Sequence, residues 1–567
     1  MDSFIICGLK GYGNYMDYKS MSVYQIWPRS FCDGNGDGIG DLEGIYSKLE
    51  YVASLGVDCI WFSPLYPSPN ADYGYDIADY KNIHPDYGDL ATFKKVLDKA
   101  HSLGLKVIMD LVVNHSSDEN KWFVEGINPE SPYHNYYFWR KGRGKNGKRP
   151  PNNWLSLIDG CAWERNEQTG EYYLHVFAKK QPDLNMDNPQ VRNEVKDIMR
   201  FWLNMGVDGF REDVITLISK KEGLPNGFPL PAATGMEHYF NGPHVKEYLT
   251  EFKEDVLDKY DCFVVGEAPM MKPKTALEYI DEKHKTLDLM FHFQHMEADC
   301  FLMDFLHTKF HLKKMKKAFS DWQTKLDGKA WNALYIENHD HPRIVSRYGS
   351  EKYREQSAKM LASMYILQKG TPFIYQGQEI GMTNIDLDAD KFVDVFAKNN
   401  AAVFRKMHFS QKWIDKMIKL SCRDNARTPM QWDNSPSAGF TAGTPWFYVN
   451  PNYKEINVAA QEADENSVLN FYRKLLAFRK ENEVVLEGKY KEYCKKSNDI
   501  YAFERVLGNT RLLTVNSFTA KGVRFEAPKG YNLEEGELVF QNYSKTPIVN
   551  NGFVLRPYET RTYLFED

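Results

Sequence analysis

The sequence predicts an α/β protein built on a (β/α)8 barrel, with a subdomain inserted after the third strand and an antiparallel β-domain at the C-terminus. Three observations support this prediction. Short apolar runs alternate with amphipathic stretches over most of the chain, and a segment rich in Asn, Pro, Gly and Trp interrupts them early. After about residue 490 the pattern changes to short alternating strands such as "DIYAFERV" and "TRLLTVNSF".

The alternating part contains eight runs typical of buried strands, in an order that predicts a parallel barrel. The stretches 42–55, 90–103 and 191–205 show apolar spacings of three and four and predict amphipathic helices between strands. "SLGVDCIWFSP" and "NMGVDGFRED" repeat one design, in which a helix end and a Gly stop precede an apolar strand. The expected strands are Val23–Pro28, Cys59–Pro64, Lys106–Asn114, Gly209–Asp213, Cys262–Glu267, Leu289–Phe293, Trp331–Asn338 and Pro372–Gln376.

Two interruptions define the domain organisation. Residues 115–185 are too many for a loop and predict an inserted subdomain, while 383–422 predict a helical, charged excursion after the eighth strand. We therefore expect a barrel formed by 21–114 and 186–490, a subdomain over 115–185, and a C-terminal β-sandwich over 491–567.

Composition excludes several classes of function. The 567 residues are 43% hydrophobic, enough for a large core, and carry a net charge of −6. The one dense basic stretch, 141–149, is typical of a loop, so we expect no nucleic-acid partner. The eight Cys form no C-x-x-C pair and predict reduced thiols. Phe4–Leu9 is too short for a membrane span and lacks a basic leader, so we expect a soluble, cytoplasmic monomer without a membrane partner.

Acidic residues and His end several of the expected strands. Asp110, Asp213, Glu267 and Asp340 would meet on one rim, because a barrel places the carboxyl ends of its strands together. Such residues can cap loops, but charged groups beside apolar runs are costly unless they are paired or used. Retaining glycoside cleavage needs one carboxylate as nucleophile and one carboxylic acid as proton donor. Arg211 lies two residues before Asp213, on the same face of the strand, and would keep that carboxylate ionised.

Four of these strand ends carry motifs of a known family. "DLVVNH" (110–115), "GFRED" (209–213), "VGEA" (265–268) and "NHD" (338–340) resemble, in order, the signature regions of the α-amylase family, glycoside hydrolase family 13. From about Val23 to the C-terminus the chain looks most like the oligo-1,6-glucosidases and dextran glucosidases, through "QPDLN" (181–185) and "RDNARTPMQWD" (423–433). The resemblance implies that Asp213 is the nucleophile, Glu267 the general acid/base and Asp340 the third carboxylate.

The same resemblance implies an exo-acting α-glucosidase with a closed glucose site and no organic cofactor. His115, Arg211 and His339 would hold the glucose ring of a small oligosaccharide. Asp72 and Arg423 would grip its non-reducing end. Tyr75 would form a stacking platform, and Phe177 either a pocket wall or an ordinary core side chain.

Linkage preference rests on Val214, the residue after the proposed nucleophile. Relatives that cleave α-1,6 bonds resemble this chain in having Val there, so we expect hydrolysis of isomaltose, panose and short isomalto-oligosaccharides. Trehalose-6-phosphate hydrolases share the motif, and α-1,4 maltases or sucrases share the scaffold, so both stay open. Sucrose isomerases share the scaffold as well and remain an alternative, less favoured because they carry an Arg-rich loop after the sixth strand, whereas "FHFQHMEADC" (291–300) has no Arg. Transporter subunits of this family lack the acids that are present here.

Four positions depart from the family pattern. They are Ile158, Glu212, Glu337 and His341, and they put the preference for the leaving group in doubt.

"DGNGDGIGDLEG" (33–44) imitates a calcium loop. Its side-chain oxygens repeat at alternate positions, Gly38 permits a sharp turn, and Gly44 replaces the usual twelfth-position Glu. Relatives place a structural Ca²⁺ here, although a metal-free turn would explain the pattern too. The expected ligands are Asp33, Asn35, Asp37, the Ile39 carbonyl and Asp41.

Overall fold

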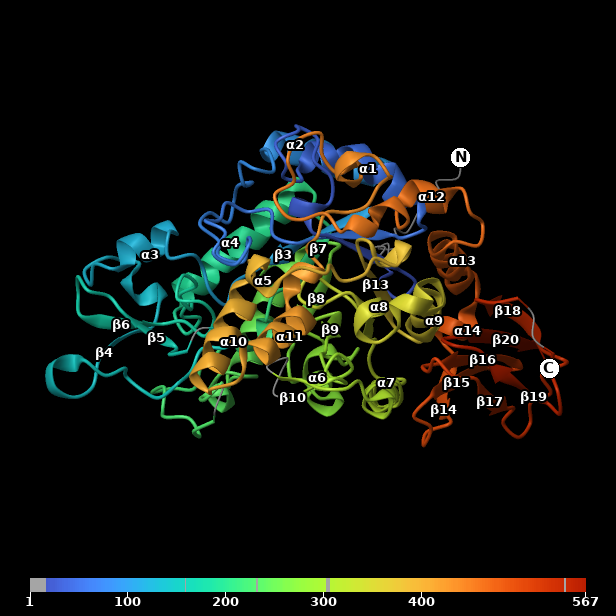
Figure 1. Cartoon of the computed structure of the whole chain (residues 1–567). Coiled ribbons are helices and arrows are strands. Elements are labelled where there is room, and N and C mark those ends of the chain that lie inside the picture. Colours follow the sequence, from blue (N-terminus) through green and yellow to red (C-terminus); the bar gives the residue numbers. More distant parts are fainter. Residues whose placement is uncertain (1–16, 159, 231–232, 302–305, 545–546, 567) are drawn as a thin grey trace, which may run out of the picture.

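Eight parallel strands form the central sheet of the computed structural model, which describes residues 17–158, 160–230, 233–301, 306–544 and 547–566. Its strand order is β12-β13-β1-β2-β3-β7-β8-β9. β9 lies against β12, so the two edges meet and the sheet curls into a barrel (Figure 1). The strands are β1 (Val23–Ile26), β2 (Cys59–Phe62), β3 (Lys106–Leu111), β7 (Gly209–Glu212), β8 (Phe263–Glu267), β9 (Leu289–Phe291), β12 (Ala333–Leu334) and β13 (Thr371–Tyr375).

All eight expected strands are present, and the fold class is confirmed. The barrel interior is filled by side chains, among them the mutually packed rings of Trp61, Phe291 and Phe373. The apolar run Phe4–Leu9 lies outside the described residues. Within the described ranges, no helix is long and apolar enough to cross a membrane.

Helices follow the strands and begin at ordinary caps. Asp41 and Asp89 accept amide hydrogen bonds at the starts of α1 and α2, and Gly206 ends α4 in the left-handed region. The three expected helices occur within two residues of their predicted bounds. The barrel helices are α1 (Leu42–Ser54), α2 (Leu90–Ser102), α4 (Pro189–Met205), α5 (Val245–Asp255), α6 (Pro273–Ile280), α7 (Leu312–Leu326), α8 (Ile344–Arg347) and α9 (Arg354–Ile366).

The segment inserted after β3 forms a small unit of its own, at the end of the molecule opposite the C-terminal sheet (Figure 1). It contains α3 (Lys121–Gly126) and an antiparallel sheet of β4 (Trp139–Lys141), β6 (Glu171–Leu174) and β5 (Trp163–Arg165). Its core joins Trp154 and Trp163 to Val214, directly after β7. The inserted subdomain therefore packs on the end of the strand that carries Asp213.

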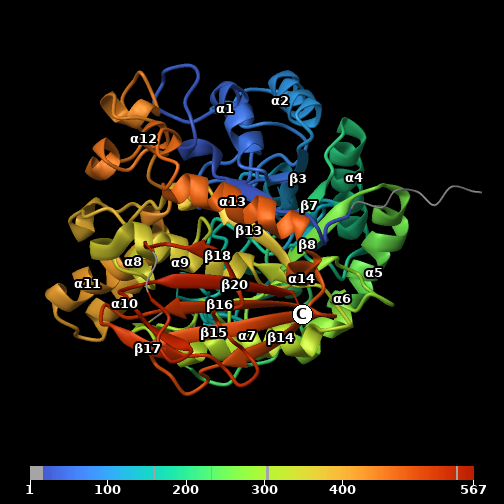
Figure 2. The same cartoon turned by 90° about the vertical axis from the view of Figure 1, so that its right-hand side faces the viewer.

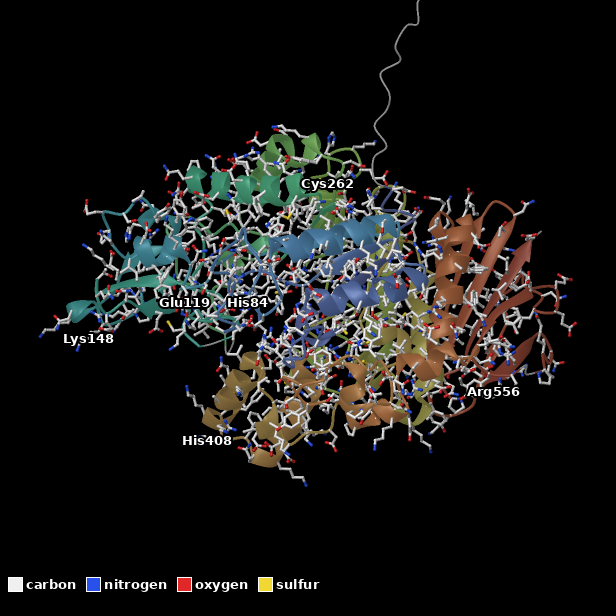
Figure 3. The ribbon with its side chains drawn as sticks, turned by 90° about the horizontal axis from the view of Figure 1, so that it is seen from above. His84, Glu119, Lys148, Cys262, His408 and Arg556 are labelled. Carbon is white, nitrogen blue, oxygen red and sulfur yellow. The ribbon has the colours of Figure 1, made fainter. Side chains whose placement is uncertain are left out.

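A helical hairpin follows β13. It consists of α10 (Val395–Lys406) and α11 (Gln411–Ser421), and Figure 3 shows His408 at its tip, away from the C-terminal sheet. Phe404 and Ile414 belong to its apolar core.

The C-terminal part is a layered antiparallel unit that faces the viewer in Figure 2. Alternation along its strands gives the larger sheet two apolar faces: Leu512 packs toward the barrel core, and Leu513 toward the smaller sheet. Lys316 of α7 donates to three backbone carbonyls of this unit, including those of Cys494 and Ile500, and so fixes it to the barrel. Helices α12 (Val458–Glu462), α13 (Val468–Glu481) and α14 (Glu483–Leu486) precede it; its strands are β14 (Lys489–Tyr493), β15 (Ile500–Leu507), β16 (Thr510–Ser517), β17 (Val523–Glu526), β18 (Glu537–Gln541), β19 (Gly552–Leu555) and β20 (Thr560–Glu566).

Glu212 is a buried acid of the barrel wall. It lies between Arg211 and Asp213 on β7, so the alternation of the strand turns it to the opposite face, away from the guanidinium. The side chain is fully buried, and neither carboxyl oxygen has a hydrogen-bond partner among the described residues. Burial, and then the charge of Asp288, raises the pKa of Glu212 to about 8.

This burial predicts a pH-dependent stability cost. Below the ordinary Glu pKa the folded and unfolded states are both protonated at Glu212, so ionisation costs nothing. As the pH rises toward about 8, the unfolded state ionises first and stability falls. We expect Glu212→Met to raise the free energy of unfolding at pH 8 by up to about 4 kcal/mol, and by much less at pH 4.5. Thermal unfolding of both proteins across this range measures the difference, and a difference independent of pH would contradict the assignment.

Candidate functional site

Arg211 occupies the centre of the rim formed by the carboxyl ends of the strands. Its Nη1 donates to Asp110 Oδ1 and to Asp213 Oδ1, each at 2.7 Å, and its Nη2 donates to Glu267 Oε2. The guanidinium is 1% exposed. The side chains of β3, β7 and β8 therefore meet at one cation, and the carboxylates of Asp213 and Glu267 are neighbours across it. Such closeness is typical of retaining glycoside hydrolases, whose two carboxyl groups lie about 5 Å apart.

The turn after β7 gives Glu267 a second donor. Val214 has φ +35°, ψ +39°, a left-handed conformation that is strained for a β-branched residue. This conformation points its amide at Glu267 Oε2, 3.2 Å away. A residue that sequence analysis linked to specificity thus also orients the second acid.

The three acids of this cluster compete for one compensating positive charge. Three carboxylates share one guanidinium, so a full set of charges would be unbalanced in a buried site. Burial raises the pKa of Asp213 well above its ordinary value; Arg211 opposes this, and the charges of Glu267 and Asp110 add to it. Sequence analysis expected Arg211 alone to keep Asp213 ionised. The structure differs because that guanidinium is divided among three acids, so its charge offsets only part of the effect of burial on Asp213.

Asp110 supports the cluster from below. It accepts hydrogen bonds from Trp61 Nε1 at 3.2 Å and from Tyr75 OH at 3.0 Å, and burial raises its pKa to about 6. Sequence analysis placed Asp110 on the rim without a role; here it anchors both Arg211 and the Tyr75 ring.

Two buried His side chains are held neutral, because burial lowers the pKa of His115 and of His339 to about 4 in each case. The amide of Gln25 donates to His339 Nδ1 at 2.7 Å, which leaves the ring proton on Nε2. That nitrogen lies 3.0 Å from Asp340 Oδ2 and 2.6 Å from Tyr75 OH. His339 therefore orients Asp340 from behind.

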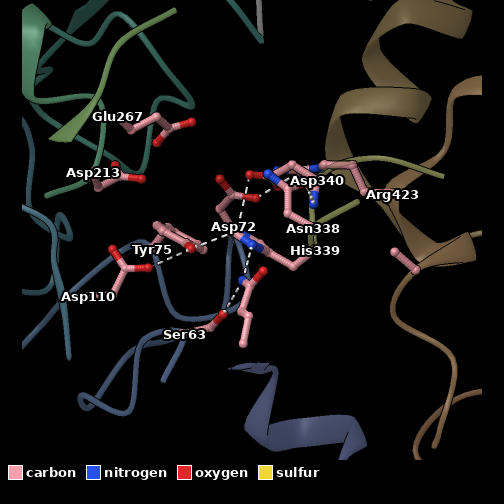
Figure 4. Close-up of polar contacts among 12 residues, drawn as sticks. Ser63, Asp72, Tyr75, Asp110, Asp213, Glu267, Asn338, His339, Asp340 and Arg423 are labelled. Atoms are coloured by element: carbon pink, nitrogen blue, oxygen red, sulfur yellow. Dashed lines mark hydrogen bonds and ion pairs between the residues drawn. The ribbon is translucent and has the colours of Figure 1, made fainter. Parts of the chain in front are cut away.

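Asp340 lies across the site from Asp213 and Glu267 (Figure 4). Two cations pair with it. Arg423 and Arg427 donate to its Oδ1 at 3.3 and 3.0 Å. Burial alone would raise the pKa of Asp340, but His339 and these two guanidinium groups hold it well below the usual range. Arg427 also donates to the His339 carbonyl, so it braces the loop that carries Asp340.

Arg423 and Asp72 close one end of the site, as Figure 4 shows. Arg423 Nη2 donates to Asp72 Oδ1 at 2.8 Å. The same Nη2 and the adjacent Nε donate to Asp394 Oδ1 at 2.7 and 3.0 Å, and the backbone amide of Arg423 donates to Asp394 Oδ2 at 3.2 Å. Asp394 caps α10 and is fully buried. Sequence analysis missed it because it lies 29 residues before Arg423, inside the helical hairpin.

Gln181 is a second residue that sequence analysis left without a role. Its amide contacts His115 Nε2 at 3.1 Å and Asp72 at 3.5 Å. The motif "QPDLN" was its only signal.

A pocket of about 540 Å³ opens above this rim. Its lining includes nine of the predicted site residues, whereas Arg211 and His339 lie behind the wall and act through the side chains they touch. Phe177 lines the pocket and packs against His115, with ring centroids 5.0 Å apart. The nine are Asp72, Tyr75, His115, Phe177, Asp213, Val214, Glu267, Asp340 and Arg423.

The four departures from the family pattern divide into two pairs. Ile158 and His341 line the pocket. Glu337 is buried below it and accepts from Arg343 Nη1 at 2.7 Å, while Glu212 faces away from the site. Only the first pair can contact a leaving group.

The predicted metal loop is a compact turn at the start of the first barrel helix. Asp33 accepts from the amides of Asn35 and Gly38 at 3.0 and 2.8 Å, and Asp41 caps α1. Gly38 needs its φ of +97°, and a Cβ there would meet the Thr444 carbonyl at 1.8 Å. No group of three or more His, Cys, Asp or Glu side chains in the described ranges is arranged to hold a metal.

The same turn nevertheless offers donors that suit a hard cation. Asn35 Nδ2 lies 3.1 Å from Asp37 Oδ2, so the two side chains face one another. Asp33, Asp37 and Asp41 form no ion pair with a described Lys or Arg. Carboxylate, amide and carbonyl oxygens are the ligands Ca²⁺ prefers, so the oxygen-only donor set fits that ion.

Comparison with known proteins gives consistent matches over the whole fold. Residues 25–488 match the family model described as alpha amylase, catalytic domain. The chain is 47% identical to an oligo-1,6-glucosidase of Parageobacillus thermoglucosidasius, over 96% of this chain and 98% of that protein. A crystal structure of Bacillus licheniformis trehalose-6-phosphate hydrolase superposes with a TM-score of 0.91 at 40% identity, covering 97% of this chain and all of that one. An isomaltulose synthase from Klebsiella sp. LX3 superposes with a TM-score of 0.93 at 37% identity, over 96% and 99% of the two chains.

The contacts of Asp394 predict a positioning role. Asp394→Asn removes the buried negative charge that pairs with Arg423. In the wild type, burial raises the pKa of Asp394, but the neighbouring guanidinium groups and hydrogen bonds outweigh burial and lower it. A charge-assisted hydrogen bond contributes about 1.5–3 kcal/mol, so we expect KM for a terminal α-glucoside to rise roughly 10–100-fold while kcat changes less. Steady-state kinetics measure this split.

The control is Asp386→Asn. Asp386 lies in the segment that leads to the same hairpin, is 95% exposed at its side chain, and pairs only with Lys419 among the described residues. We expect wild-type constants for it. Equal effects of the two substitutions, or an Asp394→Asn protein that loses kcat with an unchanged KM, would contradict the positioning role.

Proposed function

Because the chain belongs to the α-amylase family of glycoside hydrolases, we propose that it hydrolyses terminal α-1,6-glucosidic bonds of isomaltose, panose and short isomalto-oligosaccharides, with retention of configuration. The family model spans residues 25–488. The observation that carries the proposal is the pair Asp213–Glu267, bridged by one buried guanidinium in a pocket that the Asp72–Arg423 ion pair closes.

The positions of these residues in the family's motifs assign the roles in this reaction. Asp213 attacks the anomeric carbon, while Glu267 acts as the general acid and gives a proton to the leaving oxygen. The resulting glucosyl ester is hydrolysed by a water that Glu267 deprotonates. Asp340 remains ionised, because its pKa lies well below the usual range, and it supports the positive charge that develops on the sugar ring.

The closed end of the pocket supports an exo mode of action. Arg423 is engaged by Asp72, Asp340 and Asp394 and forms a wall rather than a channel. A chain of further sugar units cannot pass this ion-pair network, so one glucosyl unit fits between it and the acids.

The same network disfavours a phosphorylated substrate. Among the residues that the structure describes, Lys272 and Arg423 are the only Lys or Arg side chains that line the pocket. Arg423 is already neutralised by three carboxylates, so Lys272 is left to meet a phosphate dianion. Recognition of a phosphate ordinarily uses several donors, with Arg as the preferred residue. This supports a neutral oligosaccharide over trehalose 6-phosphate.

We also propose a structural Ca²⁺ in the loop 33–44, held by Asp33, Asn35, Asp37, Asp41 and the Ile39 carbonyl. The oxygen-only donors and the unpaired carboxylates of the turn support it. The cation would balance the charge of the turn, away from the acids of the pocket.

A cytoplasmic monomer completes the proposal. The seven described cysteines form no disulfide with one another, which agrees with the reduced state that intracellular compartments maintain. Light scattering of the purified protein tests the monomer.

A substrate panel tests the proposed function. With isomaltose, maltose, sucrose and trehalose 6-phosphate offered in parallel, we expect the highest kcat/KM for isomaltose and α-glucose as the first product. A higher value for maltose would sink the linkage assignment, and a higher value for the phosphorylated sugar would favour the trehalose-6-phosphate reaction.

Val214→Thr sharpens the same test. The Val214 side chain lines the pocket beside the nucleophile, and one methyl-sized change in such a wall is worth about 1–3 kcal/mol. We expect the isomaltose-to-maltose ratio of kcat/KM to fall roughly 10-fold or more. An unchanged ratio would remove Val214 from the account of linkage.

Metal removal tests the loop separately from the acids. We expect EGTA to lower the midpoint of thermal unfolding by several degrees and added Ca²⁺ to restore it, because a ligand that binds only the folded state stabilises it. Asp33→Asn should abolish the Ca²⁺ effect. If chelation leaves the unfolding midpoint of the metal-replete protein unchanged, the loop is a metal-free turn.

A further inference from the structure

One buried carboxylate supports the loop that follows β2 and carries Asp72 and Tyr75. This carboxylate belongs to Asp76, which is fully buried and accepts three hydrogen bonds from the same loop. Its Oδ1 accepts from Ser68 Oγ at 2.9 Å and from the Asp72 amide at 3.0 Å, and its Oδ2 accepts from the Ala71 amide at 2.8 Å. Asp76 forms no ion pair with a described Lys, Arg or His, so these three donors are the groups that offset its charge.

The loop needs such support because part of its backbone is strained. Asn70 and Tyr73 have φ of +60° and +45°, in the left-handed region that residues with a side chain disfavour. Strained conformations persist where the surrounding contacts over-determine them. The amide of Asn70 donates to Ser68 Oγ at 3.0 Å, and this hydroxyl in turn donates to Asp76. The three donors to Asp76 flank Asn70 and directly precede Tyr73, so the carboxylate holds both strained residues in place.

The two side chains that this loop presents reach the closed end of the glucose site. Asp72 Oδ1 accepts from Arg423 Nη2 at 2.8 Å, and the ring of Tyr75 stacks on that of His339 with centroids 5.2 Å apart. The Tyr75 amide donates to the Asp72 carbonyl at 3.1 Å, so both side chains belong to one turn. Asp72 and Tyr75 line the pocket, whereas Asp76 is not among the described residues that do. Any effect of Asp76 on a sugar therefore passes through its neighbours.

We propose that Asp76 is a positioning residue, which sets the orientation of Asp72 toward the non-reducing end of the glucosyl unit. The inference rests on the α-glucosidase function proposed above and adds the group that prepares this contact. Burial raises the pKa of Asp76 to about 6, against the hydrogen bonds that lower it, so at neutral pH the carboxyl group is mainly ionised. An ionised carboxylate forms stronger hydrogen bonds than a neutral group, and an amide in its place would offer a donor where the loop needs an acceptor.

Asp76→Asn tests this role in the full-length protein, with isomaltose and p-nitrophenyl α-D-glucopyranoside as substrates. Both carry the same terminal glucosyl unit, so we expect KM to rise about 10–100-fold for each, while kcat changes less than about threefold. A variant that loses kcat with an unchanged KM, or that keeps wild-type constants, would overturn the positioning role.

The matched control is Asp79→Asn. Asp79 lies shortly after Asp76 in the same segment, is exposed, and accepts only from the Lys81 amide among the described residues. We expect wild-type constants for this variant. Equal losses in the two variants would show that the effect does not come from the contacts of Asp76 and would overturn the proposal.

A double-mutant cycle with Asp72→Ala separates positioning from general support of the fold. If Asp76 acts through Asp72, Asp76→Asn should lower kcat/KM by no more than about two- to threefold once Asp72 is already alanine. A double variant that loses the product of the two single effects would overturn the proposal, because Asp76 would then contribute independently of Asp72.

Ser68→Ala provides the same test should Asp76→Asn fail to fold, because it removes one donor and leaves the carboxylate in place. We expect KM to rise several-fold, and this rise to disappear in the Asp72→Ala background; an unchanged KM in Ser68→Ala would overturn the proposal. The wild type distinguishes the two levels of inference. If it hydrolyses neither substrate, the proposed function fails and this role with it. If it hydrolyses only the nitrophenyl glucoside, the linkage assignment fails, and the KM of Asp76→Asn for that substrate still decides the role of Asp76.

Discussion

The site depends on one buried guanidinium. Arg211 contacts acids from three strands, and its charge is the only one that offsets them at close range among the described side chains. A buried charge is costly unless it is paired, and here each partner satisfies the other. Removing Arg211 would leave three buried carboxylates without a compensating charge, so the catalytic pair and the barrel rim are stabilised by the same contact. Because this cation is shared, it offsets only part of the effect of burial on Asp213.

A second ion-pair network sets the shape of the substrate site. Arg423 is held by Asp72 from the loop after β2, by Asp340 from the loop after β12 and by Asp394 from the hairpin after β13. These residues are widely separated in sequence, yet they form one wall. The hairpin therefore contributes to recognition without contacting the acids that break the bond, and a change in its packing would alter binding before it altered chemistry.

Much of this arrangement could be predicted from the sequence, because it follows from local patterns. The strand runs and the polar residues at their ends specify a rim on which Asp213, Glu267 and Asp340 meet, since parallel strands share one carboxyl edge. What the sequence did not predict depends on long-range contact or on backbone conformation. Asp394 has no motif of its own, and the left-handed turn at Val214 is unexpected for a β-branched residue. Three acids share Arg211 because the barrel brings the ends of three strands together. The sequence motif places only Asp213 beside Arg211, so it does not reveal the other two contacts.

The residues proposed for the reaction and those proposed for substrate preference lie on different parts of the chain. The acids stand at the carboxyl ends of barrel strands or in the loops that follow them, where contacts with the barrel rim hold their positions. The walls that meet a leaving group stand on the inserted subdomain, the loops after β7 and β8 and the hairpin, which are free to vary without disturbing Arg211. Trehalose-6-phosphate hydrolases and isomaltulose synthases share this fold at TM-scores above 0.9, so the barrel alone does not decide the substrate. In the described part of this chain, the residues that line the pocket beyond Val214 come largely from these segments. Under the proposed function, they and Val214 are the positions on which the preference between one α-glucoside and another depends.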